Sequence, residues 1–150
     1  MQALLRWLIK FNNMLTTVIG PMAMLLITGL DKIYQWSSIP HQLQFVAGFL
    51  VFFGASIVLW AKKANKFYAE AVRIQYERDH AVITDGPYHY IRHPGYLGYM
   101  ILSISAPLML GSLTALFPSA LIVLGYLART IYEDVSLQRQ FKGYYDYTKK

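Results

Sequence analysis

The sequence contains no cysteine, and only 15% of its 150 residues are charged. The absence of cysteine excludes disulfide bonds, thiolate zinc sites and a cysteine nucleophile. Soluble domains usually carry roughly 25% charged residues. The low charge, together with an apolar content of 55%, therefore indicates a lipid environment. The length suits a single domain covering residues 1–150.

Four apolar runs are long enough, or nearly so, to cross a membrane as helices. They cover residues 14–30, 42–61, 96–110 and 113–132. Asp31 and Lys32 are expected to end the first run, because charges are costly in the bilayer. We therefore predict an all-α integral membrane protein with about four transmembrane helices.

The remaining segments are more polar. Residues 1–13 are expected to form a short amphipathic helix at the membrane surface, and residues 33–41 an interfacial loop. Residues 133–150 form an amphipathic, tyrosine-rich end.

Pro107 and Pro118 lie inside the last two runs, and we expect them to kink those helices. Gly111 and Ser112 separate the two runs, so these helices are predicted to pack as an antiparallel hairpin.

The basic residues are distributed unevenly about these runs. Four spans would place 13 of the 14 Lys and Arg residues on one side, leaving Lys32 on the other. The positive-inside rule then places both termini and the 62–94 loop in the cytoplasm. The same rule accounts for the net charge of +6, because the basic residues flank the apolar runs. We therefore expect contact with membrane lipids and no nucleic-acid partner. No small-residue cleavage pattern follows the first run, so we expect no cleavable signal peptide.

One polar stretch, residues 84–98, concentrates residues that constrain the backbone. It holds two of the four histidines, two of the six prolines and three of the ten glycines. Gly86-Pro87 favours a turn, and Pro94 suits the first turn of a helix. Such a backbone around Arg92 and His93 favours a shaped ligand site over the alternative, a basic turn at the membrane surface.

Residues 86–98 read G-P-Y-x-Y-x-R-H-P-x-Y-x-G. This pattern resembles the signature of the isoprenylcysteine carboxyl methyltransferase family, integral-membrane enzymes that use S-adenosylmethionine. The resemblance covers roughly residues 40–150. It includes 65–67, 72–75, Glu133-Asp134, Tyr144 and Tyr147. Phospholipid N-methyltransferases and sterol reductases share the looser R-H-P-x-Y-x-G core.

The resemblance implies a cofactor site built by the cytoplasmic loop and the C-terminal amphipathic segment, binding S-adenosylmethionine and its product S-adenosylhomocysteine. The residues that match cofactor contacts are Gln75, His80, Ala81, Val82, Ile83, Tyr88, His93, Pro94, Gly95, Tyr96 and Glu133. Arg129 matches the arginine that contacts the acceptor. The family also continues into a basic, proline-containing tail, whereas this sequence stops at Lys150.

Arg129 and Glu133 are four residues apart and would share one face of a helix. The simpler interpretation is an ordinary ion pair. In the functional interpretation, tyrosine rings attract the cationic sulfonium and Glu133 accepts hydrogen bonds from ribose hydroxyls. Arg129 orients an acceptor carboxylate, which is already ionised and needs no general base.

The leading hypothesis is therefore methyl transfer to a lipophilic acceptor. A prenylated carboxylate is the first choice, and a lipid amine or another amphiphile remains open. Two alternatives are a sterol-type membrane reductase that uses NADPH and a scaffold whose basic loop binds anionic lipids. No histidine or carboxylate spacing indicates a metal site, and nothing indicates an obligate protein partner.

The charge distribution yields a first testable prediction about topology. A single cysteine replacing Gln75 should react with a membrane-impermeant maleimide only after cells are permeabilised, and one replacing Ser37 should react in intact cells. The cysteine-free parent serves as the control. Labelling of position 75 in intact cells would contradict the predicted orientation.

Overall fold

The computed structural model describes residues 2–65 and 84–140, and every regular element in these ranges is helical. In chain order the elements are α1 (Gln2–Met14), the π-helical turn η1 (Leu15–Ile19), α2 (Gly20–Tyr34), α3 (His41–Ala64), the 3₁₀ turn η2 (Gly86–His89), α4 (Pro94–Met109) and α5 (Leu116–Gln140). The prediction of an all-α fold is confirmed for these residues.

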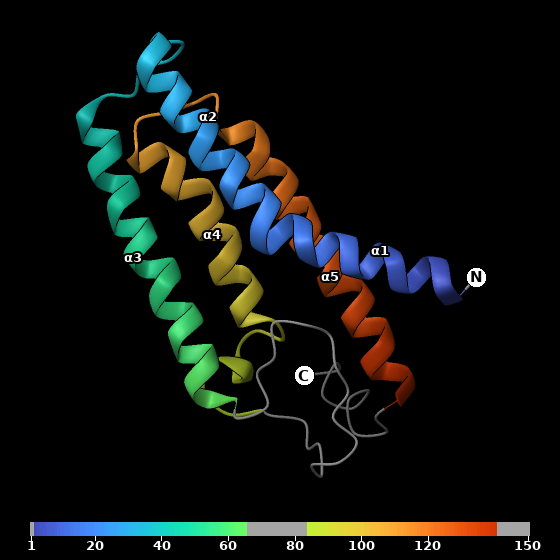
Figure 1. Ribbon diagram of the computed structural model, residues 1–150. Helices are drawn as coiled ribbons and strands as arrows, with labels where there is room; N and C mark the ends of the chain where they lie inside the picture. The colour runs from blue at the N-terminus through green and yellow to red at the C-terminus, as the bar shows by residue number, and fades with distance from the viewer. Residues whose placement is uncertain (1, 66–83, 141–150) are drawn as a thin grey trace.

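The helices form a bundle in which α4 packs against α3 on one side and α5 on the other (Figure 1). Helix α2 packs mainly against α5, and α1 departs from the bundle toward one side. The α2–α3 and α4–α5 connections lie at one end of the bundle. Helix α3 ends, and α4 begins, at the opposite end, where η2 also lies.

The observed helix boundaries agree best with the predicted ones for uncharged segments that have polar residues at both ends. Helix α3 extends the predicted 42–61 run by one residue at its start and three at its end, and α4 begins two residues before the predicted 96–110 run. The short helix predicted for residues 1–13 corresponds to α1, which ends at Met14. η1 and α2 follow it without a break to residue 34, so the first run continues a helix that has already begun.

Asp31 does not end its helix as predicted, since α2 continues to Tyr34. The Asp31 side chain is only 1% exposed and accepts hydrogen bonds from donors in two connections. Ser37 donates through its backbone N–H (2.7 Å) and its hydroxyl (2.6 Å), and Thr114 donates at 2.8 Å. Ser112 also donates to this carboxylate. These bonds compensate the desolvated charge, so it can remain inside the helix.

The two prolines of the predicted hairpin occupy different positions. Pro107 lies inside α4, as expected. Pro118 lies in the first turn of α5, where its missing N–H leaves no intrahelical bond unmade, so the predicted kink at this residue is wrong. The connection between the helices runs from Leu110 to Ala115 and is therefore longer than the two residues expected.

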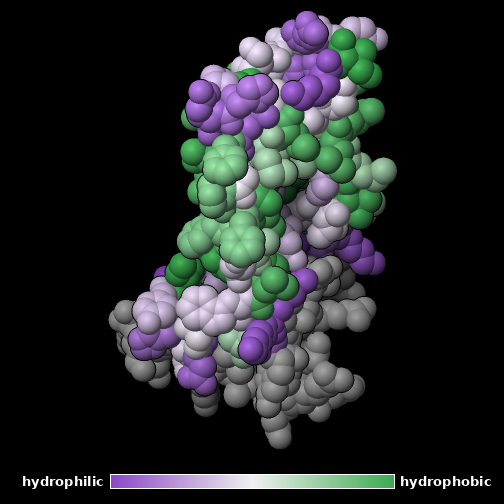
Figure 2. Space-filling model, turned by 90° about the vertical axis from the view of Figure 1, so that its left-hand side faces the viewer, coloured by the Kyte–Doolittle hydropathy of each residue, from purple (hydrophilic) through white to green (hydrophobic). Residues whose placement is uncertain are grey.

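The outer surface of the bundle is apolar. Helices covering Trp7–Tyr34 and His41–Ala64 are long and apolar enough to cross a membrane. On α3, Phe45, Phe49 and Phe52 are at least 63% exposed, which a water-soluble bundle would disfavour. Figure 2 shows hydrophobic side chains over the middle of this face and hydrophilic ones above and below. This distribution is the one expected of a membrane protein.

Glycines let α4 approach α3 closely near the start of α4. A Cβ atom on Gly98 would lie 2.6 Å from Cγ2 of Val58 and 2.8 Å from the carbonyl oxygen of Gly54. Small residues commonly allow such close packing between membrane helices. The contact places the first turn of α4 beside α3, where the candidate site begins.

The Asp31 cluster gives a prediction about stability. Asp31→Asn replaces a carboxylate oxygen with an amide donor facing hydroxyl donors, which should lower the free energy of unfolding by about 1–3 kcal/mol. Thermal unfolding in detergent measures the change. Ser38→Ala, at an exposed neighbouring position, is the matched control. Equal melting temperatures for the two variants would contradict the assigned role.

Candidate active site

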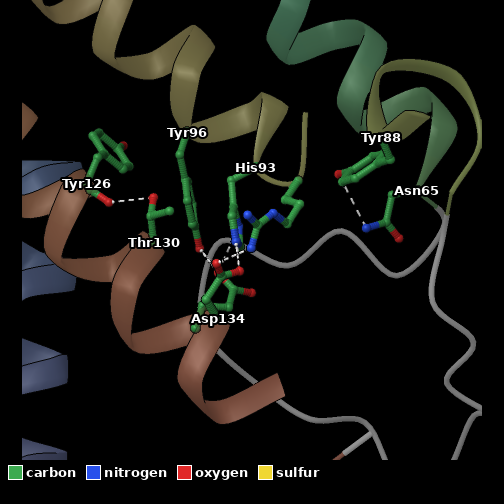
Figure 3. Close-up of polar contacts among 9 residues, drawn as sticks. Asn65, Tyr88, His93, Tyr96, Tyr126, Thr130 and Asp134 are labelled. Atoms are coloured by element: carbon green, nitrogen blue, oxygen red, sulfur yellow. Dashed lines mark hydrogen bonds and ion pairs between the residues drawn. The ribbon is translucent and has the colours of Figure 1, made fainter. Parts of the chain in front are cut away.

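The segment before α4 is a turn fixed against the end of α3. Gly86 has φ +61°, a value that favours glycine, so the turn predicted there is confirmed. A Cβ atom on Gly86 would lie 3.1 Å from Cβ of Ala64. Asn65 donates a hydrogen bond from Nδ2 to the Tyr88 hydroxyl at 3.3 Å (Figure 3). These contacts fix η2 at the end of the bundle.

Pro94 begins α4, as its position in the sequence predicted. His93 precedes it, so the His93 and Tyr96 side chains lie on the same side of the first helical turn. Their rings stack with centroids 5.6 Å apart and an angle of 3° between the planes. The Tyr96 side chain is 9% exposed. The start of α4 therefore presents an aromatic pair toward α5.

Two consecutive carboxylates on α5 meet this pair. Nε2 of His93 lies 2.7 Å from Oδ1 of Asp134, and because an ionised carboxylate only accepts, Nε2 carries the hydrogen. Nδ1 of His93 lies 3.8 Å from Oε2 of Glu133, which also accepts a 2.7 Å hydrogen bond from the Tyr96 hydroxyl. Arg92 donates to Oδ2 of Asp134 at 2.9 Å. Figure 3 shows His93, Tyr96 and Asp134 converging between the two helices.

Arg129 lies one turn before Glu133 on α5 and is only 4% exposed. Its guanidinium carbon lies 5.0 Å from the ring centroid of Tyr96 and 5.7 Å from that of Tyr126, within cation–π range. The ring of Tyr126 stacks in turn on Tyr99, at 5.4 Å and 6°. Nη1 of Arg129 also lies 3.5 Å from the Thr16 hydroxyl. Arg129 is thus held among tyrosines rather than at the protein surface.

A pocket of about 290 Å³ opens beside Arg129. Its lining residues come from η1, α2, α4 and α5, and Arg129 is the charged one among them. They are Thr16, Thr17, Pro21, Met24, Tyr96, Tyr99, Leu102, Ser103, Ala106, Ile122, Tyr126 and Arg129. An apolar pocket with one cationic group suits an amphiphile whose anionic head meets the arginine.

The structure brings together four of the residues singled out from the sequence: His93, Tyr96, Arg129 and Glu133. Pro94 and Gly95 are buried in the first turn of α4 and shape its beginning. Tyr88 contacts Asn65 at the end of α3. The other predicted cofactor residues, Gln75, His80, Ala81, Val82 and Ile83, lie outside the described residues.

The sequence did not predict the contacts that several other side chains make in this site. Asp134 was noted only as part of the sequence pattern, and Arg92 was placed at the centre of the expected site without a partner. Tyr126, three residues before Arg129, could have been found from helical spacing, because residues at i and i+3 share a face. Thr16 carries no signal in the sequence, since its contact with Arg129 joins residues 113 positions apart.

The described residues form a helical bundle with an apolar outer surface and a buried arginine beside a largely apolar pocket, features typical of a membrane protein. The chain belongs to the isoprenylcysteine carboxyl methyltransferase (ICMT) family, whose model matches residues 46–139. The family is membrane-embedded, and its methyltransferase chemistry implies a methyl donor.

Similar proteins carry the corresponding names. A probable protein-S-isoprenylcysteine O-methyltransferase of Oryza sativa subsp. japonica is 34% identical over 90 residues, covering 58% of this chain and 47% of the rice protein. The protein-S-isoprenylcysteine O-methyltransferase of Schizosaccharomyces pombe is 28% identical over 90 residues, covering 59% and 38%. Protein-S-isoprenylcysteine O-methyltransferase A of Arabidopsis thaliana is 32% identical over 79 residues, covering 52% and 40%.

The matched part of this chain thus spans about half the length of these relatives or less. No solved structure matches the chain.

Proposed function

We propose that this protein transfers a methyl group from S-adenosylmethionine to the carboxylate of a lipophilic, isoprenylcysteine-like acceptor. The observation that carries the proposal is the buried Arg129 guanidinium in the wall of a largely apolar pocket, in which no other described lining residue is charged. A prenyl chain fits the apolar walls, and a carboxylate fits the guanidinium as a bidentate partner. The names of the relatives in rice, yeast and Arabidopsis point to the same acceptor class.

The residues around His93 fit the proposed cofactor. Glu133 and Asp134 provide acceptor oxygens that suit ribose hydroxyls and an amino group, and Arg92 suits a carboxylate. The Tyr96 ring lies between this polar cluster and Arg129, and an aromatic face there suits a sulfonium cation. Tyr88, Pro94 and Gly95 would complete the described part of the site, with Gln75 and residues 80–83 assigned by resemblance.

In this mechanism the protein aligns its reactants and excludes water. When bound, S-adenosylmethionine supplies a methyl carbon that bonds to the acceptor oxygen while sulfur keeps the electrons of the broken bond, leaving S-adenosylhomocysteine. The acceptor carboxylate is already ionised, so no side chain has to remove a proton. Arg129 orients it, and alignment of this kind can supply roughly 7–11 kcal/mol of the barrier.

The proposal includes a membrane arrangement for residues 1–150 as one domain. The helices would cross the bilayer about four times, with both termini and the 62–94 loop in the cytoplasm. Two features support this arrangement. The first is the apolar band on the bundle (Figure 2). The second is that η2 and the start of α4, which contacts the α5 carboxylate of Asp134, lie at the end of the bundle opposite the α2–α3 and α4–α5 connections (Figure 1). The cofactor site would then face the cytoplasm.

Cofactor binding tests the proposed activity. Titration calorimetry in detergent should detect saturable binding of S-adenosylmethionine and S-adenosylhomocysteine, because the site offers acidic, basic and aromatic contacts. NADPH should produce no binding heat beyond dilution. Micromolar binding of NADPH without a response to either adenosyl compound would instead assign the protein to the reductase class.

Substitutions on α5 separate the two proposed binding roles. Glu133→Gln should weaken binding of S-adenosylhomocysteine about 10- to 100-fold, since a hydrogen bond to a charged group contributes roughly 1.5–3 kcal/mol. Arg129→Lys keeps the charge but loses the bidentate geometry, so it should leave this affinity nearly unchanged and lower turnover.

Thermal melts and cofactor titrations of both variants provide the measurements. Ile131→Val, at a 68% exposed position on the same helix, is the matched control. A structural ion pair would make both variants less stable by similar amounts, with cofactor affinity of the folded protein unchanged. That result would contradict the assigned roles.

A further inference from the structure

The first helical run contains a π-helical turn beside Arg129. Between Leu15 and Ile19 the helix widens, and the N–H of Gly20 bonds to the carbonyl oxygen of Leu15, five residues earlier. Short π-helical turns are rare and frequently occur at functional sites. Thr16, in this turn, is 1% exposed and faces α5, whereas its neighbour Thr17 is exposed.

The Thr16 hydroxyl is arranged to accept a hydrogen bond from Arg129. It donates its hydrogen to the helix, with the carbonyl oxygen of Asn12 at 2.9 Å and that of Asn13 at 3.2 Å. Its oxygen keeps lone pairs that can accept, and a guanidinium has only donors. Nη1 of Arg129 lies 3.5 Å away and is directed to this oxygen. The Thr16 oxygen is therefore a hydrogen-bond acceptor at the Nη1 edge of the guanidinium.

The π-helical turn packs against α5 at Gly125, which lies one helical turn before Arg129. Nδ2 of Asn12 donates to the carbonyl oxygen of Gly125 at 3.1 Å. A Cβ atom on Gly125 would lie 2.4 Å from Cγ2 of Thr16 and 2.9 Å from Oδ1 of Asn12, so no larger residue fits without a shift. Because residues 125 and 129 share a helix face, this close approach fixes Thr16 relative to Arg129.

The same segment forms part of the pocket wall. Thr16, Thr17, Pro21 and Met24 line the pocket together with Arg129. All four precede residue 46, where the match to the family begins, so the family signature does not assign them a role.

We propose that Thr16 is a positioning residue for the acceptor: its hydroxyl orients the Arg129 guanidinium toward a carboxylate in the pocket. This inference rests on the proposed function for the nature of the acceptor. Arg129 contacts the carboxylate, and Thr16 acts through Arg129.

Binding selectivity provides the test without requiring turnover. The probes are an N-acetylated S-prenylcysteine and its neutral carboxamide, titrated against the full chain in detergent. The wild type should bind the acid at least tenfold more tightly than the amide. Thr16→Val keeps the shape of the side chain but removes the hydroxyl, and it should reduce this ratio about fivefold or more while leaving amide binding unchanged.

Two variants serve as matched controls. Thr28→Val removes a buried hydroxyl from the same helical run, one that bonds the Met24 carbonyl oxygen at 2.8 Å and does not line the pocket, and should keep the wild-type ratio. Thr16→Ser retains the hydroxyl but loses the methyl group against Gly125, and should keep most of the ratio even if its melting temperature falls.

The two proposals fail in distinguishable ways. A selective wild type with the same ratio in Thr16→Val and Thr28→Val would overturn the role of Thr16 and leave the proposed function intact. A wild type that does not prefer the acid would overturn both proposals. Loss of acid and amide binding together in Thr16→Val would show a packing role and likewise overturn the positioning role.

Discussion

The contacts of Glu133 and Asp134 with the start of α4 are the interaction on which the site depends. Two carboxylates beside an apolar bundle are costly unless they are paired, and His93, Tyr96 and Arg92 provide hydrogen bonds and a positive charge. Both carboxylates lie within α5, which continues to Gln140, past the apolar run that ends at residue 132. The pairing fixes the face of α5 that carries Arg129.

The sequence predicted the parts of the fold that depend on local chemistry. Uncharged runs bounded by polar residues predicted α3 and α4 to within three residues, because the apolar length of a spanning helix is set by the bilayer. Gly86 and Pro94 predicted a turn followed by a helix start, because their backbone preferences do not depend on distant residues. His93, Tyr96, Arg129 and Glu133 were identified through the resemblance, and their mutual contacts are consistent with it.

One prediction was wrong because a charge has partners that are distant in the sequence. Asp31 was expected to end a helix, but donors about 80 residues away in the α4–α5 connection stabilise it inside one. The pairing of Asp134 with Arg92 and His93 likewise joins residues about 40 positions apart. Composition and periodicity describe a residue together with its neighbours, so they cannot identify such partners.

The pocket combines two parts of the chain with different relations to the family. Helices α4 and α5, within the matched residues 46–139, carry Tyr96 and Arg129, which would recognise groups common to all acceptors of this kind. The part of the wall formed by Pro21 and Met24 lies before the match. Apolar contacts discriminate by shape and size, and one methylene changes binding by only about 1–3 kcal/mol. In the proposed function, Arg129 would contact the carboxylate, whereas the apolar wall would combine Leu102, Ala106 and Ile122 inside the match with Pro21 and Met24 outside it. The preference for a lipophilic chain could then differ from that of the relatives through Pro21 and Met24 while the arginine contact is retained.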